Sequence, residues 1–543
     1  MNSNCTTSDR SDERKKKKSV GIVGGGVSGL TTAKAAIECG LVPTVFERND
    51  DIGGVWNEKD GYTWDSMKTN LSYYSCMYSD YPWKTKPAAE DLFPSGKEVQ
   101  AYLKDYATHF EVYPQCIKFE CTVTRVHQDN ITEKWTIEWT NNNKNNINNS
   151  NNNIYNKEEY DYVIIASGYF SQCDQPSNIG QLESVFGKDG VSYVRHYKHP
   201  DEALRNKKIV MVGGSYSGCE IAVDLASTVG QIVMVTRHRP WYMKRSFSKD
   251  GIAPIRPLDI NFFTRNGDHM LRSHYKTVQD QNKAKYTNFS KLFGHQQTIP
   301  SVRVDGEPTD HLYGAITDRF VELVEQGKIV MKYSDVDYAI VDKETGRRSI
   351  KFKDGSVEDQ IDHLYISTGY KLTFPFFDQD MLDALQYDPN DGFQAVLLHK
   401  TVFCPGKRGI AFVGIFKGPF FGLSELQSRW ATMVFTGKDG LDYPTKEEFD
   451  IGIAEEQRIR SDRPRKQWPH GNTVEFSEDL AKQIKCLPDF DKIQKEDPYL
   501  YKMLWYNFIS PVSYRLQGFG SNPKLAIEHL KEIDSKFNNF PKS

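Results

Sequence analysis

Two segments far apart in this 543-residue chain each place a glycine-rich turn between a short apolar run and a helical pattern. The first starts at Val20 and has the sequence GGGVSG over residues 24–29, and the second starts at Lys208 and has GGSYSG over residues 213–218. Strand, GxGxxG-like turn and helix in this order are typical of units that bind dinucleotides, because the turn brings a diphosphate to the helix N-terminus. Two such units predict an α/β protein with two Rossmann-like domains.

The first glycine turn has the residue that such a unit needs at each position. Gly24 permits the tight turn, Gly26 lets the backbone approach a diphosphate, and Gly29 lets the helix pack against the strand. A second apolar run, residues 43–46, ends at Glu47, about 20 residues beyond the first glycine, where this kind of unit has the acid that binds an unmodified ribose. We therefore predict that this unit binds FAD.

The second turn differs from this pattern in two ways. Ser215 stands at the position of the second glycine, where even a small side chain crowds the phosphate, and the next strand leads to Arg237 instead of an acid. A carboxylate there would repel a 2′-phosphate, whereas a guanidinium pairs with it through two hydrogen bonds, and Arg239 is a second candidate for this contact. The unit is predicted to bind NADPH through Gly213, Ser215, Ser217, Gly218 and Arg237.

The two units suggest one nucleotide-binding domain inserted into another. Short alternating strands occur between residues 336 and 368, and residues 141–153 are almost all Asn between two strand patterns. The predicted division is a basic disordered tail over 1–18, the first part of the FAD domain over 19–206 with an Asn-rich loop at 141–156, the NADPH domain over 207–335, and the second part of the FAD domain over 336–543. Two interpretations of the lysines at 15–18 stay open: a solvated segment before the first strand, or a targeting signal.

Charge and cysteine content exclude several classes of function. Lys and Arg number 69 against 72 Asp and Glu, so the net charge of −3 gives no general attraction to nucleic acid or anionic lipid. Nine scattered cysteines without a CxxC pair argue against a disulfide framework, a zinc ribbon and a thioredoxin-type redox pair, and indicate a reducing compartment. No apolar segment approaches the ~18 residues that a membrane span needs. We expect a soluble cytoplasmic protein without a bound metal.

Beyond the glycine turns, the chain resembles the flavin-containing monooxygenases at several short motifs. The sequence GGVW at residues 53–56 resembles the element that this family places at the flavin, and Thr69 with Asn70 resembles its active-site Thr-Asn pair. Further similar motifs are SDYP at 79–82, YK at 197–198, ISTGY at 366–370, ELQSRW at 425–430 and YRL at 514–516. The resemblance extends over about residues 19–520, apart from the Asn-rich run.

This resemblance implies a two-stage reaction with two cofactors. NADPH reduces FAD, O₂ then adds to the reduced flavin to form a C4a-(hydro)peroxide, and one oxygen atom passes to a nucleophilic nitrogen or sulfur of a small molecule. By the same resemblance, Asn70 is catalytic and stabilises the peroxide and NADP⁺, while Gly54, Val55, Trp56 and Thr69 bind cofactor. Such a reaction requires little acid–base apparatus.

Alternatives stay open for single residues and for the reaction. Trp56 alone fits a core aromatic residue, and Asn70 alone fits a turn residue. Tyr193 stands where the family has a His, which leaves the efficiency of coupling open. The competing functions are a Baeyer–Villiger-type monooxygenase, a quinone-type NADPH oxidoreductase and a redox-inactive nucleotide-binding scaffold. The sequence names neither the substrate nor the oligomeric state.

Overall fold

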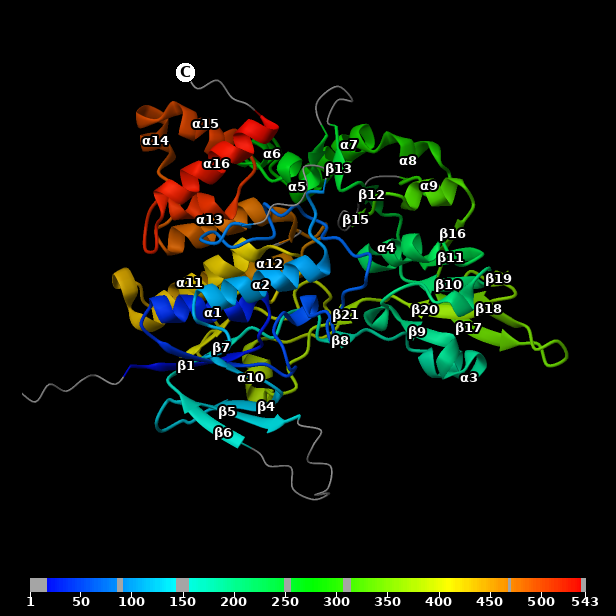
Figure 1. Ribbon diagram of the computed structural model, residues 1–543, viewed down its shortest axis with the longest axis horizontal. Helices are drawn as coiled ribbons and strands as arrows, with labels where there is room; N and C mark the ends of the chain where they lie inside the picture. The colour runs from blue at the N-terminus through cyan, green and yellow to red at the C-terminus, as the bar shows by residue number, and fades with distance from the viewer. Residues whose placement is uncertain are drawn as a thin grey trace, which may run out of the picture.

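Two parallel five-stranded sheets, each accompanied by helices, form the frame of the protein (Figure 1). This computed structural model describes residues 17–84, 91–142, 156–248, 255–305, 314–466 and 470–538. Most of the predicted basic tail and of the predicted Asn-rich loop lies outside these residues. The two sheets confirm the predicted α/β class with two dinucleotide-type units.

The first sheet is built around β1 and has the strand order β22-β7-β1-β2-β3, with every pair parallel. Its strands are β1 (Ser19–Val23), β2 (Val42–Phe46), β3 (Ile117–Lys118), β7 (Tyr162–Ile165) and β22 (Ile410–Phe412). Val20, Ile22 and Val45 are completely buried, as expected for a parallel sheet that is covered on both faces. The last strand of the first sheet, β22, follows every strand of the second sheet in the sequence.

The second sheet repeats this plan around β10, with the order β16-β11-β10-β20-β9 and every pair parallel. Its strands are β9 (Val191–Tyr193), β10 (Lys208–Val212), β11 (Gln231–Thr236), β16 (Ile329–Tyr333) and β20 (His363–Ile366). Strands β9 and β20 fall outside residues 207–335, the range predicted for the NADPH domain. The difference arises because strand pairing across more than 100 residues leaves no local pattern in the sequence.

Smaller sheets accompany the two main ones, and all of those in the described residues are antiparallel except the β12–β15 pair, which is parallel. β5 (Trp135–Asn141) pairs with β4 (Cys121–Gln128) and with β6 (Asn156–Tyr160), so the Asn-rich run joins two neighbouring strands. The alternating strands predicted after residue 336 are β17 (Val336–Val341), β18 (Arg348–Phe352) and β19 (Val357–Glu358). Three two-stranded pairs complete the set: β8 (Gln172–Cys173) with β21 (Tyr370–Lys371), β12 (Trp241–Met243) with β15 (Gly314–Ile316), and β13 (Ser246–Phe247) with β14 (Arg256–Pro257).

Helices cover the sheets and build a separate helical region at the C-terminal end (Figure 1). The helices that follow the central strands are α1 (Val27–Glu38) and α4 (Tyr216–Leu225). The others are α2 (Gly96–His109), α3 (Ile179–Phe186), α5 (Leu258–Phe262), α6 (Arg265–His274), α7 (Val278–Leu292), α8 (Gly294–Thr298), α9 (Phe320–Glu325), α10 (Gln379–Ala384), α11 (Phe421–Thr436), α12 (Lys446–Ser461), α13 (Thr473–Gln483), α14 (Phe490–Glu496), α15 (Pro498–Tyr506) and α16 (Pro523–Phe537). Within the described ranges, none of them is long and apolar enough to cross a membrane.

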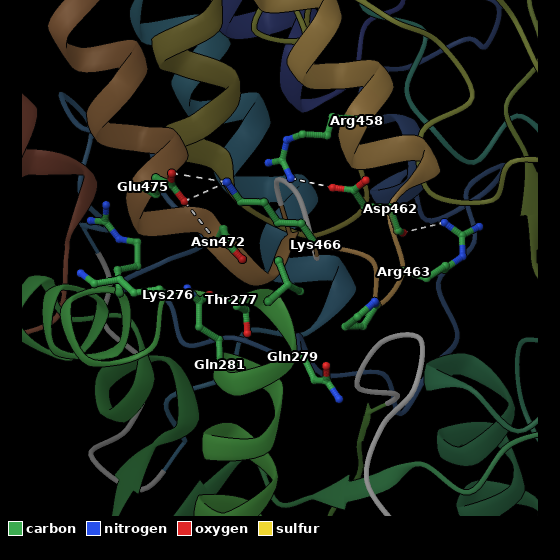
Figure 2. A pocket seen from close by; sticks show the side chains of 13 residues that line it. Lys276, Thr277, Gln279, Gln281, Arg458, Asp462, Arg463, Lys466, Asn472 and Glu475 are labelled. Atoms are coloured by element: carbon green, nitrogen blue, oxygen red, sulfur yellow. Dashed lines mark hydrogen bonds and ion pairs between the residues drawn. The ribbon is translucent and has the colours of Figure 1, made fainter.

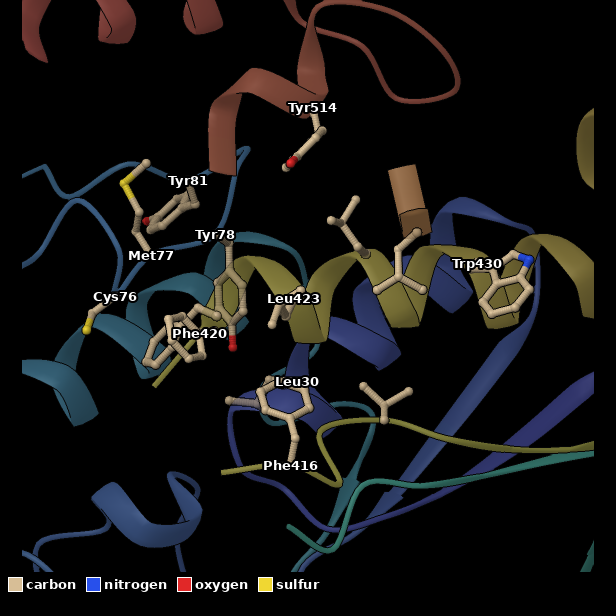
Figure 3. Close-up of a cluster of buried hydrophobic side chains, with 14 of the residues drawn as sticks. Leu30, Cys76, Met77, Tyr78, Tyr81, Phe416, Phe420, Leu423, Trp430 and Tyr514 are labelled. Carbon is tan, nitrogen blue, oxygen red and sulfur yellow. The ribbon is translucent and has the colours of Figure 1, made fainter. Parts of the chain in front are cut away.

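The main hydrophobic core lies where α11 packs against α1 (Figure 3). Leu30 of α1 and Leu423 and Trp430 of α11 belong to it, together with Tyr78 and Phe416 from two loops. Each of these five side chains is at most 7% exposed, so burial of apolar surface holds the C-terminal part of the chain against the first dinucleotide unit.

A buried ion network reinforces this contact. Arg515 is 1% exposed, and its Nη2 lies 2.8 Å from Asp80 Oδ2 and also contacts the Glu425 carboxylate. The Ser79 N–H donates to Glu425 Oε2 at 2.7 Å, and Lys34 of α1 pairs with Asp80. Although burial opposes ionisation, Arg515 and Lys34 hold the pKa of Asp80 below its usual value. These residues of the SDYP, ELQSRW and YRL motifs therefore join distant segments of the fold.

Candidate active site

The first glycine turn has the shape that a bound diphosphate requires. Gly24 has φ +108°, and a Cβ there would lie 2.6 Å from the Ala166 carbonyl oxygen. A Cβ at Gly29 would lie 1.8 Å from the Gly24 oxygen, so α1 packs directly onto the turn. Gly26 is the N-cap of α1, where no side chain caps the helix and the first turn has no acidic residue. The free N-terminal N–H groups of α1 therefore fit a phosphate.

Glu47 lies beside this turn at the end of β2. Its side chain is 4% exposed, with Oε2 accepting the Gly25 N–H at 2.8 Å and Oε1 accepting the Asn49 N–H at 2.9 Å. Burial raises the pKa of the Glu47 carboxyl, and the two N–H donors oppose that shift. The carboxylate thus lies next to the first glycine turn, in the position predicted for the acid that binds an unmodified ribose.

The GGVW element packs against the same turn. Gly53 donates its N–H to the Gly25 oxygen at 3.1 Å, and a Cβ at Gly54 would lie 3.1 Å from the Gly26 Cα. Gly54 begins a short 3-10 helix, η1 (Gly54–Trp56), in which Val55 is half-buried. Trp56 is 7% exposed and belongs to the main hydrophobic core. The backbone of this element therefore borders the predicted FAD site, while its Trp is packed as a core residue.

The second glycine turn repeats the geometry of the first. Gly213 has φ +107°, and a Cβ there would lie 2.1 Å from the Ser367 oxygen. A Cβ at Gly218 would lie 2.1 Å from the Gly213 oxygen. Ser215, the exposed N-cap of α4, has φ −100° and ψ −165°, nearly the same extended backbone as Gly26 with φ −88° and ψ −166°. Any residue can adopt this extended backbone, and Ser215 is exposed. A serine is therefore accommodated at the position where the first turn has a glycine.

The remaining residues of this unit also leave room for a nucleotide. Ser217 is half-buried in the first turn of α4, a turn without acidic residues. Arg237 follows β11 with its side chain 72% exposed, and its Nε lies 3.8 Å from Asp335 Oδ1. The Arg239 guanidinium lies 3.9 Å from the Tyr333 ring centroid and donates to two backbone carbonyls. Arg237 is therefore the more available of the two for a 2′-phosphate.

Thr69 and Asn70 differ in how their side chains are used. Thr69 is 1% exposed, and its hydroxyl donates to the Leu71 carbonyl at 2.7 Å while its N–H donates to the Pro94 carbonyl at 2.9 Å. Asn70 is half-buried, and its amide makes no hydrogen bond with any residue of the described ranges. Thr69 therefore stabilises the local turn, and the Asn70 amide is available to a ligand.

The Tyr193 hydroxyl is engaged at the edge of β9. It lies 3.2 Å from Gln175 Nε2 and 3.5 Å from Glu183 Oε1, and burial together with Glu183 raises its pKa. The tyrosine that stands where the family has a His is thus held by two hydrogen-bonding side chains.

Two charged residues that contact residues 68–75, here called the Asn70 segment, were not predicted from the sequence. Arg245 donates to the Thr69 carbonyl at 3.0 Å, and Asp259 accepts the Ser72 hydroxyl at 2.6 Å. Neither residue belongs to a recognisable motif, and Thr69 and Ser72 lie more than 170 residues away from them in sequence, so no local signal could have linked them to this segment.

A cavity of about 540 Å³ lies away from both glycine turns, between α6, α7 and the connection from α12 to α13 (Figure 2). Four of its charged side chains form two ion pairs: Arg458 Nη1 lies 2.7 Å from Asp462 Oδ2, and Lys466 Nζ lies 3.2 Å from Glu475 Oε2. None of its lining residues comes from a glycine turn or from residues 68–75. In the part of the chain that the structure describes, no group of His, Cys, Asp and Glu side chains is arranged to hold a metal.

Comparison with known proteins decides the family. A model described as FMO-like, flavin-binding monooxygenase-like, matches residues 17–531. The chain belongs to this family. It is 30% identical over 524 residues to human flavin-containing monooxygenase 2, with 93% of this chain and 89% of the relative covered. It is 29% identical over 528 residues to rat dimethylaniline monooxygenase (N-oxide-forming) 2, with the same coverage.

Solved structures share the fold. An S-allyl-L-cysteine S-oxygenase from Allium sativum matches with a TM-score of 0.58 and 20% identity, covering 96% of this chain and 99% of the other. A cyclohexanone monooxygenase in an open form matches with a TM-score of 0.60 and 12% identity, covering 86% and 97%. OTEMO, solved with FAD and NADP, matches with a TM-score of 0.57 and 14% identity, covering 81% and 90%. This protein is an FAD-containing, NADPH-dependent monooxygenase, as the motifs implied.

Proposed function

We propose that this protein transfers one oxygen atom of O₂ to a nucleophilic nitrogen or sulfur of a small molecule, and that Asn70 contacts the reacting atoms. The observation that carries the proposal is that the Asn70 amide makes no hydrogen bond with any described residue, on a segment otherwise fixed by hydrogen bonds. The names of two relatives agree with the substrate class, since one forms an N-oxide and one oxygenates the sulfur of S-allyl-L-cysteine.

The two glycine turns would hold the two cofactors. The turn at Gly24, Gly26 and Gly29 would place the FAD diphosphate at the N-terminus of α1, with Glu47 on the ribose. Gly213, Ser215, Ser217 and Gly218 would hold the NADPH diphosphate at α4, with Arg237 on the 2′-phosphate. When bound, FAD supplies the redox chemistry between NADPH and O₂.

The residues of the chain would orient the reacting oxygen and exclude water from it. Asn70 is neutral and offers both a donor and an acceptor, so it can hydrogen bond a reacting oxygen without giving up a proton. The residues that follow it are closed to water, with Leu71 4%, Tyr73 1% and Tyr74 0% exposed. Exclusion of water favours oxygen transfer over release of H₂O₂.

Oxygen incorporation tests this proposal. The holoenzyme is given NADPH, ¹⁸O₂ and either a tertiary amine, a sulfide or a cyclic ketone, and the products are analysed by mass. We expect one ¹⁸O atom in an N-oxide or sulfoxide. A labelled lactone without N- or S-oxide would identify a Baeyer–Villiger enzyme, and NADPH oxidation that needs a quinone and no O₂ would identify a reductase.

We also propose the domain division and the compartment. The insertion of an NADPH domain into an FAD domain is supported by the return of β22 to the first sheet, and the strand membership of the second sheet favours boundaries near 190 and 367 over 207 and 335.

A cytoplasmic location is supported by eight cysteines that are free in the described part of the chain. Limited proteolysis and cell fractionation test the two proposals.

A further inference from the structure

Arg245 joins the Asn70 segment to the second dinucleotide unit. It is 7% exposed, its Nε donates to the Thr69 carbonyl at 3.0 Å, and its Nη2 lies 3.5 Å from the Lys68 carbonyl. The same guanidinium pairs with Glu220 of α4, and its Nη1 donates to Asp318 Oδ2 at 2.8 Å. One planar group therefore connects two backbone carbonyls of the Asn70 segment with two carboxylates of the inserted region.

Asp259 holds the other end of the segment. It lies in the first turn of α5 and is 0% exposed. Its Oδ2 accepts the Ser72 N–H at 3.1 Å, the Ser72 hydroxyl at 2.6 Å and the Ser75 hydroxyl at 2.6 Å. Three donors on one buried carboxylate oxygen fix the backbone at residues 72–75.

The Asn70 side chain depends on these two attachments for its location. Its amide has no hydrogen bond of its own in the described part of the chain, so the location of the side chain depends on how the backbone on either side of it is held. That backbone is attached at Thr69 through Arg245 and at Ser72 through Asp259, one residue before and two residues after Asn70.

We propose that Arg245 and Asp259 are positioning residues for Asn70, and that Arg245 couples its location to α4, the helix proposed to hold NADPH. The inference deepens the proposed function and rests on the role of Asn70 given there. The fork of a guanidinium is needed, because four acceptors in different directions exceed what an ammonium group at the end of a flexible stem can hold together.

The test compares two buried arginines. Arg245→Lys keeps the charge and loses the fork. Arg265→Lys is the matched control, because Arg265 is 2% exposed and donates to Glu478 at 2.6 Å and to the Leu504 carbonyl at 2.7 Å, without a hydrogen bond or ion pair to residues 68–75. FAD content and the melting temperature establish that each variant is folded and loaded.

Hydrogen exchange of the peptide covering residues 68–75 is then measured on each holoenzyme, together with H₂O₂ released per NADPH. In Arg245→Lys we expect exchange of this peptide to rise about tenfold and the peroxide yield to rise with it, while Arg265→Lys leaves both at the level of the unmodified enzyme. Unchanged exchange in Arg245→Lys, or an equal rise in Arg265→Lys, would overturn the positioning role.

Two further variants separate this inference from the proposed function. Asp259→Asn keeps the shape of the second attachment and weakens it, and it takes the place of Arg245→Lys if that variant does not fold; the same rise in exchange is expected, and its absence counts against the inference. Asn70→Ala leaves both attachments intact. A normal product yield in Asn70→Ala contradicts the role of Asn70, whatever the exchange measurements show.

Discussion

At the scale of single residues, the amide of Asn70 is the group whose chemistry we expect to matter most. Asn70→Asp preserves the shape of the side chain and places a negative charge where a neutral donor stood, so FAD binding and NADPH oxidation should persist. The yield of N-oxide or sulfoxide per NADPH should fall and H₂O₂ should rise by about tenfold or more, since ~1.4 kcal/mol of lost stabilisation changes a rate tenfold. Oxygen uptake with and without catalase measures the ratio, and an unchanged ratio contradicts the assignment.

Arg237 should decide between the two nicotinamide cofactors. Its exposed guanidinium stands at the end of β11, and a hydrogen bond to a charged phosphate contributes about 1.5–3 kcal/mol. Arg237→Ala should therefore raise KM for NADPH by about tenfold or more and leave KM for NADH nearly unchanged. Steady-state kinetics with both cofactors provide the measurement and its internal control. Equal changes in the two KM values would show that Arg237 does not bind the 2′-phosphate.

At the scale of elements, the contact between α1 and its glycine turn permits a sharp steric prediction. A methyl group at Gly29 would lie 1.8 Å from the Gly24 oxygen, so Gly29→Ala must push α1 away from β1. We expect loss of bound FAD, measured by the ratio of flavin to protein absorbance. Gly180→Ala in α3 is the control, because its Cβ meets nothing within 4 Å and alanine favours a helix by about 0.5–1 kcal/mol. Full flavin content in Gly29→Ala would contradict the cofactor site.

The elements also show how far sequence reasoning reaches. The two glycine turns, α1, α4 and the acid at Glu47 were predictable because strand, turn and helix are consecutive in the chain, and steric demands act over a few residues. The membership of strands β9 and β20 in the second sheet was not predicted, because their pairing depends on partners far along the chain. Arg245 and Asp259 were missed for the same reason. Trp56 could be assigned to the core only once its neighbours were known.

At the scale of the whole molecule, the buried network of Asp80, Arg515 and Glu425 links the first and last quarters of the chain. The pKa of Asp80 is held below its usual value, and an acid of this kind contributes stability above its unfolded pKa and loses it as the pH falls through the folded pKa. Asp80→Asn should therefore lower the melting temperature by several degrees at pH 7, and the difference from the unmodified protein should shrink toward pH 3.

A calorimetric pH series on both proteins measures this effect. Asp442→Asn is the control, because Asp442 is 85% exposed in its pair with Arg408, and an exposed pair contributes little. A melting-temperature difference for Asp80→Asn that stays constant between pH 7 and pH 3 would show that ionisation of Asp80 is not the source of its stabilising effect.

The late position of β22 has a consequence for how this protein is made. All five strands of the second sheet lie between residues 191 and 366, whereas the first sheet needs a strand at residues 410–412. On the ribosome, the second sheet has its full set of strands while β7 still presents an open edge, because its neighbouring strand β22 has not been synthesised. A nascent chain that stops before residue 410 therefore carries the complete first glycine turn on an unfinished sheet, and the sheet beneath the turn is completed only when β22 (Ile410–Phe412) of this 543-residue chain has been made.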